Sequence, residues 1–322
     1  MKRVIKRLAN GFFNLIDTPA VVLLYHRVVD LSLDPQELCV SPENFDAHLG
    51  LLHRKYNVLS VEEFTELVNK GKGFPSNAVL LTFDDGYADN HFNARPILED
   101  HQMQALFFVA TGLIDTSLEF WWDDIERIFL LDNNLPEKLS ISVKGTTYEF
   151  PTDQKSKART YNELHPVIKR CDVAERADAL LQILQWSGLP AEGRTSHRVM
   201  TWSELVDFSK SPAVVVGAHT HTHPRLSNCN LESQRSEIGT SMKLLQGALG
   251  KDIVHFSYPF GNRPDYNENS IQVCRELGFQ MVCANYPSTV HRWHSKYAVP
   301  RMLVRNWEVE EFDLRMKTFF NS

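Results

Sequence analysis

The amino-acid sequence predicts an α/β fold built on a parallel sheet of about seven strands, either an α/β barrel or a doubly wound sheet. Short runs that are apolar throughout recur along the chain, as expected for strands buried on both faces. The segments between these runs have the apolar spacing and the capping residues of helices. Because the chain contains neither a GxGxxG nor a Walker A sequence, the nucleotide-binding form of the doubly wound sheet is disfavoured.

Strand and helix patterns alternate in chain order. The predicted strands are residues 21–25, 78–83, 105–110, 214–218, 254–258, 281–284 and 302–304, and residues 57–59 could add a short accessory strand. The predicted helices are residues 41–56, 60–71, 201–208, 231–249 and 270–277. Ser60 with Glu63, and Thr201 with Glu204, have the capping-box pattern of a helix start, and Gly250 is a typical helix end.

One long stretch breaks this rhythm, because the residues between the third and fourth predicted strands contain no buried strand run. Residues 139–150 alternate in polarity around Lys144 and Gly145, which predicts an exposed hairpin. Residues 166–186 have the pattern of one or two helices. No linker-like composition separates the stretch, so we expect one domain over residues 19–322 with a roughly 80–100-residue insertion on its rim, at about residues 115–200.

Composition and charge limit the classes of function. The 322 residues carry a net charge of −6, so there is no basic field for a nucleic-acid backbone and no nucleic-acid partner is expected. No apolar run approaches the roughly 20 residues of a membrane-spanning helix. The five cysteines include no CxxC pair, which disfavours a disulfide framework and indicates a reducing, cytoplasmic compartment.

The first 18 residues combine basic side chains with apolar residues at helical spacing. Polar residues interrupt the apolar stretch and no small-residue cleavage site follows, so a signal peptide is not expected. We expect residues 1–18 to form an amphipathic helix that either packs on the body of the protein or touches anionic lipid, as a peripheral contact at the inner face of the membrane. The basic residues are Lys2, Arg3, Lys6 and Arg7.

Two carboxylates follow the second predicted strand. The sequence TFDDG at residues 82–86 puts Asp84 and Asp85 where a barrel strand presents catalytic groups. Neighbouring residues of an extended chain point in opposite directions, so both side chains can face one site only if the chain turns, which Gly86 permits. A surface Asp-Asp-Gly turn is the alternative interpretation.

Three histidines follow the fourth predicted strand, at His219, His221 and His223. Residues four apart share a face of a helical turn, so His219 and His223 could bind one metal ion while His221 points elsewhere. An incidental solvated loop is the alternative. One Asp with two His would form a three-ligand centre with room for water and substrate, as in hydrolytic zinc sites, and the second Asp would remain as a base.

These motifs resemble those of the polysaccharide deacetylases of carbohydrate esterase family 4, the NodB-homology group. TFDDG resembles the first family motif, residues 219–224 (HTHTHP) the second, and residues 258–261 (YPFG) the third. Residues 25–28 (YHRV) look like branches of the family that act on bacterial surface glycans. The resemblance covers about residues 20–305 without the insertion, and it implies a distorted, incomplete (β/α) barrel.

The resemblance also implies a role for each motif residue. Asp84 would be the catalytic base, and Asp85, His219 and His223 would hold a divalent metal ion, zinc by ligand type. Phe260 would offer its backbone N–H to the oxyanion. A histidine would protonate the leaving amine.

Two positions depart from the family pattern. Ser257 stands where the third motif usually has an Arg that steadies the base, and the late motif that supplies the acid histidine is unclear, with His291 and His294 in the right region. We expect Arg301, at the start of the last strand, to replace the missing Arg beside Asp84. A surface position at the strand start is the alternative for Arg301.

Other candidates carry weaker signals. His26 ends the first strand and either lines the pocket or is a core histidine with satisfied hydrogen bonds. Trp121 and Trp122 open the insertion and either stack on a sugar or fill a core.

The sequence therefore predicts a metal-dependent N-deacetylase that acts on an N-acetylated sugar. A cytoplasmic location would make the substrate a lipid-linked or nucleotide-linked precursor of a bacterial surface glycan. The alternatives are an amidase acting on a non-sugar substrate and a catalytically silent glycan-binding protein. A pure binder would have no use for the spare base Asp84.

Overall fold

The computed structural model describes residues 17–131 and 134–320. The helix expected over residues 1–18 lies outside the described residues, except for residues 17 and 18. None of the described helices has the length and apolar composition that crossing a bilayer requires. All five cysteines are buried and none is in a disulfide.

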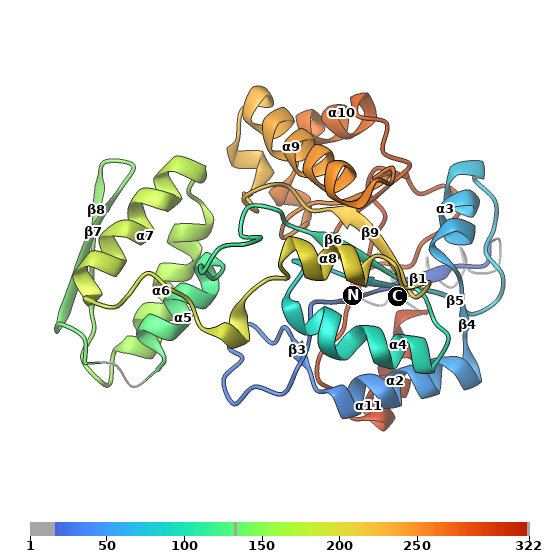
Figure 1. Ribbon diagram of the computed structural model, residues 1–322, viewed down its shortest axis with the longest axis horizontal. Helices are drawn as coiled ribbons and strands as arrows, with labels where there is room; N and C mark the ends of the chain where they lie inside the picture. Colours follow the sequence, from blue (N-terminus) through green and yellow to red (C-terminus); the bar gives the residue numbers. More distant parts are fainter. Residues whose placement is uncertain (1–16, 132–133, 321–322) are drawn as a thin grey trace, which may run out of the picture.

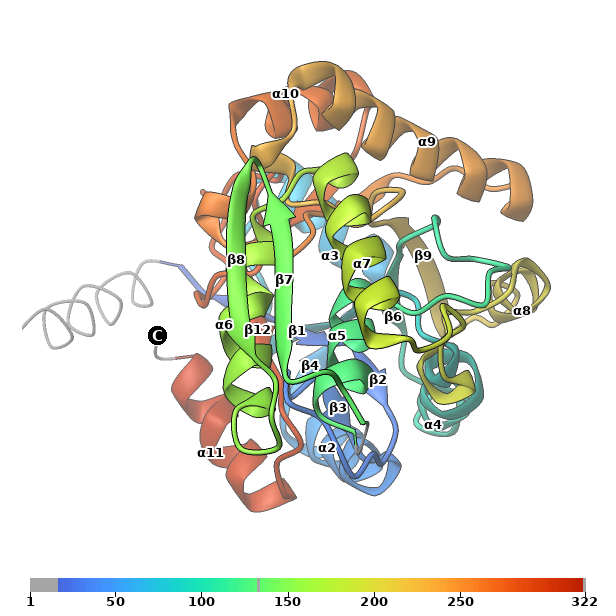
Figure 2. The same cartoon turned by 90° about the vertical axis from the view of Figure 1, so that its left-hand side faces the viewer.

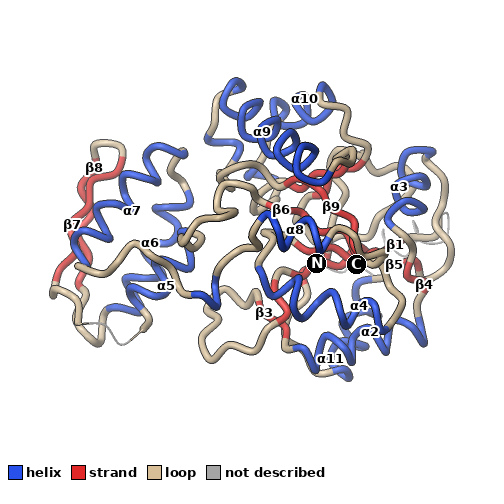
Figure 3. Tube along the Cα trace, in the orientation of Figure 1, coloured by secondary structure: helices blue, strands red, loops and turns tan. Residues whose placement is uncertain are grey.

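A curled parallel sheet forms the centre of the protein, with helices around it (Figure 1, Figure 3). Within the described residues its strand order is β11-β10-β9-β6-β5-β1-β12, and the short strand β4 pairs with β5. Its members are β1 Ala20–Tyr25, β4 Asn57–Val58, β5 Ala78–Phe83, β6 Ala105–Val109, β9 Val214–Ala218, β10 His255–Ser257, β11 Met281–Cys283 and β12 Met302–Leu303. The incomplete (β/α) barrel of about seven parallel strands is thereby confirmed. Its strands are apolar on both sides because both faces of the sheet are covered.

Residues 299–303 run between the two edges of this sheet. Val299 forms an isolated parallel bridge with Cys283 of β11, and Met302 pairs in parallel with Leu23 of β1. The segment thus runs from β11, at one edge of the sheet, to the other edge, where it forms β12 beside β1. It carries Arg301, which is buried.

The helices that cover the sheet begin and end where their capping residues lie. Ser60 and Thr201 accept hydrogen bonds from the backbone N–H groups three residues on, and Gly71 ends α3 in the left-handed conformation, with φ of 58°. These helices are α2 Pro42–Lys55, α3 Val61–Lys70, α4 Arg95–Asp100, α8 Trp202–Phe208, α9 Leu231–Leu249, α10 Glu268–Glu276 and α11 Val309–Phe319. Short elements complete the body: β2 Arg27–Val28 and β3 Cys39–Val40, which pair with each other, and the single turns η1 Asn90–Ala94, η2 Thr195–His197, η3 Leu226–Asn228 and η4 Arg263–Asp265.

The segment between β6 and β9 leaves the sheet, because these two strands pair directly with each other. It contains α5 Trp121–Phe129, β7 Lys138–Val143, β8 Thr146–Pro151, α6 Lys157–Lys169 and α7 Val173–Ser187. These elements gather beside the sheet in Figure 1, and the antiparallel hairpin β7–β8 faces the viewer in Figure 2. The hairpin is less exposed than its sequence predicted. Its apolar face is buried because β7 packs against α7.

A buried histidine joins α2 to the C-terminal helix. The His48 ring stacks on Phe312 of α11 with ring centroids 3.9 Å apart, and its Nε2 lies 2.7 Å from the Trp307 carbonyl oxygen. Burial lowers the pKa of His48 from 6.5 to about 4. The imidazole is therefore neutral in the folded protein at neutral pH.

We predict that this histidine makes the fold sensitive to acid. Above pH 6.5 His48 is neutral in both the folded and the unfolded protein. Between pH 6.5 and about 4 only the unfolded protein binds a proton at His48, so the free energy of unfolding decreases as the pH falls through this range. The loss is at most about 3 kcal/mol. Urea unfolding of His48→Gln should show a shallower decline over this range than the wild type. His53→Gln, an exposed position on the same helix, is the matched control and should unfold with the wild-type pH profile.

Candidate active site

Three metal-ligand side chains converge at the carboxyl edge of the sheet. The Nε2 atoms of His219 and His223 are 3.2 Å apart, and they lie 3.5 Å and 3.3 Å from Oδ1 of Asp85. Ligands bound tetrahedrally to one zinc ion, with bonds of about 2.0–2.1 Å, are separated by about 3.3 Å. The three atoms therefore have the spacing of three corners of such a site, and the residues fit a divalent cation.

Hydrogen bonding and burial prepare these groups to bind a cation. Nδ1 of His219 lies 2.8 Å from the Ser257 carbonyl oxygen, which can only accept, so this nitrogen carries a proton and Nε2 is the atom left to bind a cation. Burial lowers the pKa of His219, but the Asp84 and Asp85 carboxylates outweigh it and raise this pKa, so a cation would replace a proton at Nε2. Burial opposes ionisation of Asp85, but the His219 and His223 imidazoles outweigh it and hold the pKa of this carboxyl below its ordinary value. Burial lowers the pKa of His223 to about 4. A carboxylate and neutral imidazoles are the protonation states that bind metal.

The two histidines do not lie on a helical turn, which corrects the expectation from their spacing. They lie on a loop after β9 in which Thr220 and His223 have φ of 66° and 55°. Pro224 disfavours helical backbone at the preceding residue, and Oγ1 of Thr220 instead accepts a hydrogen bond from the His223 N–H at 3.1 Å. His221 points away as expected, and its Nδ1 lies 3.0 Å from Oγ1 of Thr111.

A tight turn after β5 lets both aspartates face the site. Asp85 and Gly86 are in the left-handed region, with φ of 76° and 84°. A Cβ at Gly86 would lie 2.9 Å from Cγ1 of Val109, so only glycine fits. The turn that Gly86 was expected to permit is present.

The Asp84 carboxylate is held by a buried guanidinium. Nη1 and Nη2 of Arg301 each donate to one oxygen of Asp84, both at 2.7 Å. Burial raises the pKa of Asp84, but Arg301 outweighs it, so the net shift is downward and the carboxylate stays ionised. The expected contact between Arg301 and Asp84 is therefore present, and the alternative that Arg301 is a surface residue is wrong.

Further hydrogen bonds fix the guanidinium in place. Its Nε donates to the Ala284 carbonyl oxygen at 3.0 Å, and its Nη2 donates to Oγ of Ser257 at 2.7 Å. Ser257 stands where the family usually has the stabilising Arg. Its small hydroxyl leaves space for Arg301 to arrive from another strand and also gives it an acceptor.

The site opens into a cavity of about 210 Å³. His26 lines it and is a neighbour of Asp84, because Tyr25 and Phe83 pair in the β1–β5 ladder. Nδ1 of His26 is buried, and no hydrogen bond to it exists in the described part of the chain. Phe260 also lines the cavity, with φ of 60° and its ring centroid 4.8 Å from that of His223.

The structure does not bring His291 to this cavity, which corrects its prediction as a catalytic acid. Val290 pairs with Ala20 at the start of β1, at the opposite end of the strands. Nδ1 of His291 lies 3.3 Å from a carboxylate oxygen of Asp17, and its ring stacks on Trp293. Of the three histidines named from the sequence outside residues 219–223, His26, His291 and His294, only His26 is among the described residues that line the cavity.

The insertion supplies side chains to the site, one of which, Trp122, was a candidate from the sequence, whereas His165 and Lys169 were not. Trp122 of α5 packs its ring 4.8 Å from that of His223, so it lines the pocket while being buried. His165 and Lys169 of α6 also line the cavity, and Nζ of Lys169 lies 4.2 Å from the Phe260 ring centroid. Nothing in the spacing of His165 or Lys169 marks them, since their placement depends on how the insertion folds back.

Comparison with solved structures identifies the fold. The Streptococcus pyogenes deacetylase PplD, solved in complex with acetate, superposes with a TM-score of 0.61 at 18% identity, over 93% of this chain and 99% of that one. At this level of identity the likeness concerns the fold. The protein is therefore an α/β protein with the curled, incomplete barrel seen in deacetylases.

Sequence comparison identifies the family. The family model for polysaccharide deacetylase matches residues 71–135 and 150–282, which is more than half of the chain. The Bacillus subtilis protein YxkH, a candidate polysaccharide deacetylase, is 22% identical over 88% of this chain and 70% of its own length. The Escherichia coli poly-β-1,6-N-acetyl-D-glucosamine N-deacetylase is 30% identical over 30% of this chain and 14% of its own. This chain belongs to the polysaccharide deacetylase family.

We predict that His223→Ala removes a metal ion from the protein. Loss of one of three ligands leaves two atoms that cannot hold a cation tightly, so the metal content after dialysis should fall from one equivalent at this site to a small fraction of it. Elemental analysis by mass spectrometry measures this. His221→Ala, on the same loop with its ring turned away, is the control and should leave the content unchanged. An unchanged content in His223→Ala would contradict the assignment.

A second prediction concerns the fork between Arg301 and Asp84. Arg301→Lys keeps the positive charge but cannot make two parallel hydrogen bonds to the carboxylate. We expect kcat to fall by about 10–100-fold, because the base loses its fixed orientation, while the metal content stays that of the wild type. An unchanged kcat would show that the fork has only a structural role.

Proposed function

We propose that this protein is a metal-dependent hydrolase that removes the acetyl group from an N-acetylated sugar. One observation carries the proposal: the cation-sized triangle of Asp85, His219 and His223 lies beside a carboxylate, Asp84, that a buried Arg301 keeps ionised. A binding protein gains nothing from a second, ionised carboxylate next to a metal site. A hydrolase needs one to take a proton from water.

The roles of the residues follow from their positions. A divalent cation held by Asp85, His219 and His223 would supply Lewis-acid polarisation of the acetyl carbonyl. Asp84 takes the proton of the attacking water, and the Phe260 N–H donates a hydrogen bond to the oxyanion, an interaction typically worth about 3–4 kcal/mol. We assign to His26 the transfer of that proton from Asp84 to the leaving amine, because burial lowers the pKa of His26 and its neutral ring must gain a proton before it can donate one. The amine thus gains the proton that the water loses, and the products are acetate and the free amino sugar.

The substrate proposal rests on the family and on the cavity. The family and the activity of the Escherichia coli relative support an N-acetylated glycan as the substrate. Five buried cysteines without a disulfide suit a reducing, cytoplasmic compartment, and in that compartment the substrate would be a lipid-linked or nucleotide-linked precursor. Zinc is the cation we propose, from the ligand types.

An acetate-release assay tests the activity. We predict release of acetate from N-acetylglucosamine derivatives, tested side by side as β-1,6-linked oligomers, a nucleotide-linked sugar and a lipid-linked sugar. Asp84→Asn should keep its metal and lose about 10²–10⁴-fold in kcat, because the base is gone and the ligands remain. Release only from an N-acetylated non-sugar amide would identify an amidase, and binding without release would identify a glycan-binding protein.

We also propose that the basic N-terminal segment brings the protein to anionic membrane. The proposal is drawn from sequence, because residues 1–16 lie outside the described part. Co-sedimentation with vesicles containing phosphatidylglycerol should fall with added salt, and it should be lost when Lys2, Arg3, Lys6 and Arg7 are changed to Gln. Equal pelleting of the neutral variant, or none by the wild type, would reject it.

A further inference from the structure

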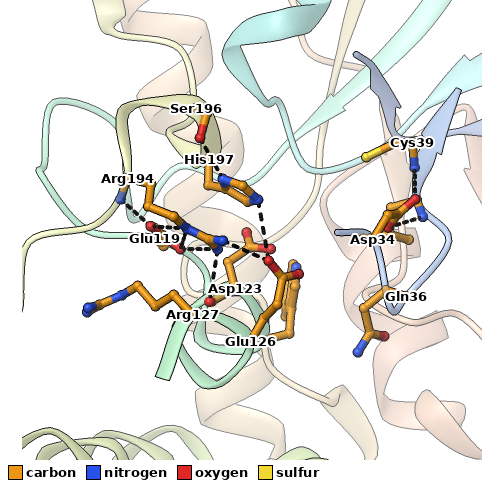
Figure 4. A network of polar contacts seen from close by, with 12 residues as sticks. Asp34, Gln36, Cys39, Glu119, Asp123, Glu126, Arg127, Arg194, Ser196 and His197 are labelled. Atoms are coloured by element: carbon orange, nitrogen blue, oxygen red, sulfur yellow. Dashed lines mark hydrogen bonds and ion pairs between the residues drawn. The ribbon is translucent and has the colours of Figure 1, made fainter. Parts of the chain in front are cut away.

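A second group of metal-ligand side chains is buried away from the candidate active site. Asp123 and Glu126 lie three residues apart on α5, so they share a face of the helix, and His197 reaches them from η2, at the end of the insertion. One ligand atom from each lies within 4.8 Å of the others. Figure 4 shows the three side chains directed toward one another.

The His197 imidazole has one nitrogen without a hydrogen bond. Its Nδ1 lies 2.9 Å from Oγ of Ser196. Its Nε2 points at Glu126 but lies 3.7 Å from the nearest carboxylate oxygen, and no other contact to it is present in the described residues. The residue is only 5% exposed and lines a small cavity, so only a group within that cavity could satisfy this atom. A cation between the imidazole and the carboxylates would do so.

The carboxylates around this point outnumber the cations. Three nearby arginines form ion pairs with carboxylates. Arg194 pairs with Glu119 and Glu126, Arg127 pairs with Asp124, and Arg27 pairs with Asp89. Within the described residues the Asp123 carboxylate accepts a hydrogen bond from a neutral donor, the Tyr87 hydroxyl at 2.7 Å, and the nearby charge of Arg27 also favours its ionised form. Buried carboxylates are stable only when paired, protonated or bound to metal. Burial raises the pKa of both Asp123 and Glu126, so a proton is the competitor that a cation would have to displace.

A small cavity marks where a cation could sit. It offers about 10 Å³ of space to the centre of a water-sized sphere, enough for one water or one ion. One guanidinium and three carboxylates line this cavity, so the carboxylates offset the charge of Arg27. The polar lining residues are Arg27, Asp34, Gln36, Cys39, Asp123, Glu126 and His197. Ligands of one ion, with bonds of about 2.0–2.2 Å, lie no more than about 4.4 Å apart. A bound cation would draw these side chains inward by a few tenths of an ångström.

We propose that Asp123, Glu126 and His197 bind a divalent transition-metal ion in a structural site distinct from the candidate active site. Two carboxylates with one imidazole suit Zn²⁺ or Mn²⁺ better than Mg²⁺ or Ca²⁺, which favour oxygen ligands alone. The ion joins α5 to η2, the two ends of the insertion where it meets the barrel.

The site also connects to the wall of the candidate active site. The Tyr87 hydroxyl, two residues after Asp85, donates to Asp123 and accepts a hydrogen bond from Nε1 of Trp122 at 2.9 Å. The Trp122 ring in turn packs on His223. A cation at Asp123 would therefore fix the position of an indole that contacts a ligand of the first metal.

Metal binding in a background without the first site tests the proposal. In His219→Ala/His223→Ala, equilibrium dialysis against Zn²⁺ or Mn²⁺ should leave one equivalent bound, and Mg²⁺ should not compete. Adding His197→Gln should weaken this binding at least about tenfold and abolish the rise in Tm caused by the metal. Adding Asp124→Asn instead, a neighbour on α5 that pairs with Arg127, should leave it unchanged.

Three results would overturn the site: no metal in the background variant, an equivalent that survives His197→Gln, or equal loss in Asp124→Asn. The second would mean an adventitious ion only. If His197→Gln does not fold by circular dichroism, Co²⁺ titration of the wild type decides. Two equivalents with visible absorption bands support the site, and a single equivalent rejects it. The measurement does not depend on deacetylase activity.

Discussion

The interaction on which the site depends is the buried fork between Arg301 and Asp84. One guanidinium, reaching in from the segment before β12, bonds the carboxylate after β5, the hydroxyl at the end of β10 and the carbonyl after β11. It therefore holds the catalytic ends of three strands at fixed separations. Removing either partner would leave an unpaired buried charge, which costs about 3–5 kcal/mol. The Arg301 hydrogen bonds that orient Asp84 therefore also hold the ends of these strands in the curled sheet.

The sequence was sufficient to predict the sheet and the residues of the candidate site at its edge. Runs that are apolar throughout identify strands buried on both faces, and for this reason all seven predicted strands are present. The two clusters at residues 84–85 and 219–223 follow strands of one parallel sheet, so their carboxyl ends had to meet. Arg301 was inferred from a chemical requirement, a cation for the base. The crossing of residues 299–303 between both sheet edges explains how a strand start reaches the active edge.

What the sequence did not predict depends on loops and on the insertion. His291 lies in a histidine-rich stretch, but residue 290 pairs with the start of β1 and thereby fixes its neighbour at the wrong end of the strands. His165 and Lys169 enter the cavity because the insertion folds back on the barrel, a tertiary arrangement without local signature. The group formed by Asp123, Glu126 and His197 could not be predicted either, since His197 lies about 70 residues after the two carboxylates and none of the three stands in a motif.

The backbone shows where the scaffold holds conformations that the chain would not adopt alone. Among the described residues, nine other than glycine have positive φ, and four of them are Asp85, Thr220, His223 and Phe260. Such conformations cost about 1–3 kcal/mol each. They persist because buried hydrogen bonds and a rigid sheet edge leave these loops no alternative. These conformations direct the Asp85 carboxylate, the His223 imidazole and the Phe260 N–H toward the same cavity. Regular helix or strand geometry would not bring groups from such positions together. The left-handed turns, more than the identity of any single side chain, therefore convert a strand edge into a site.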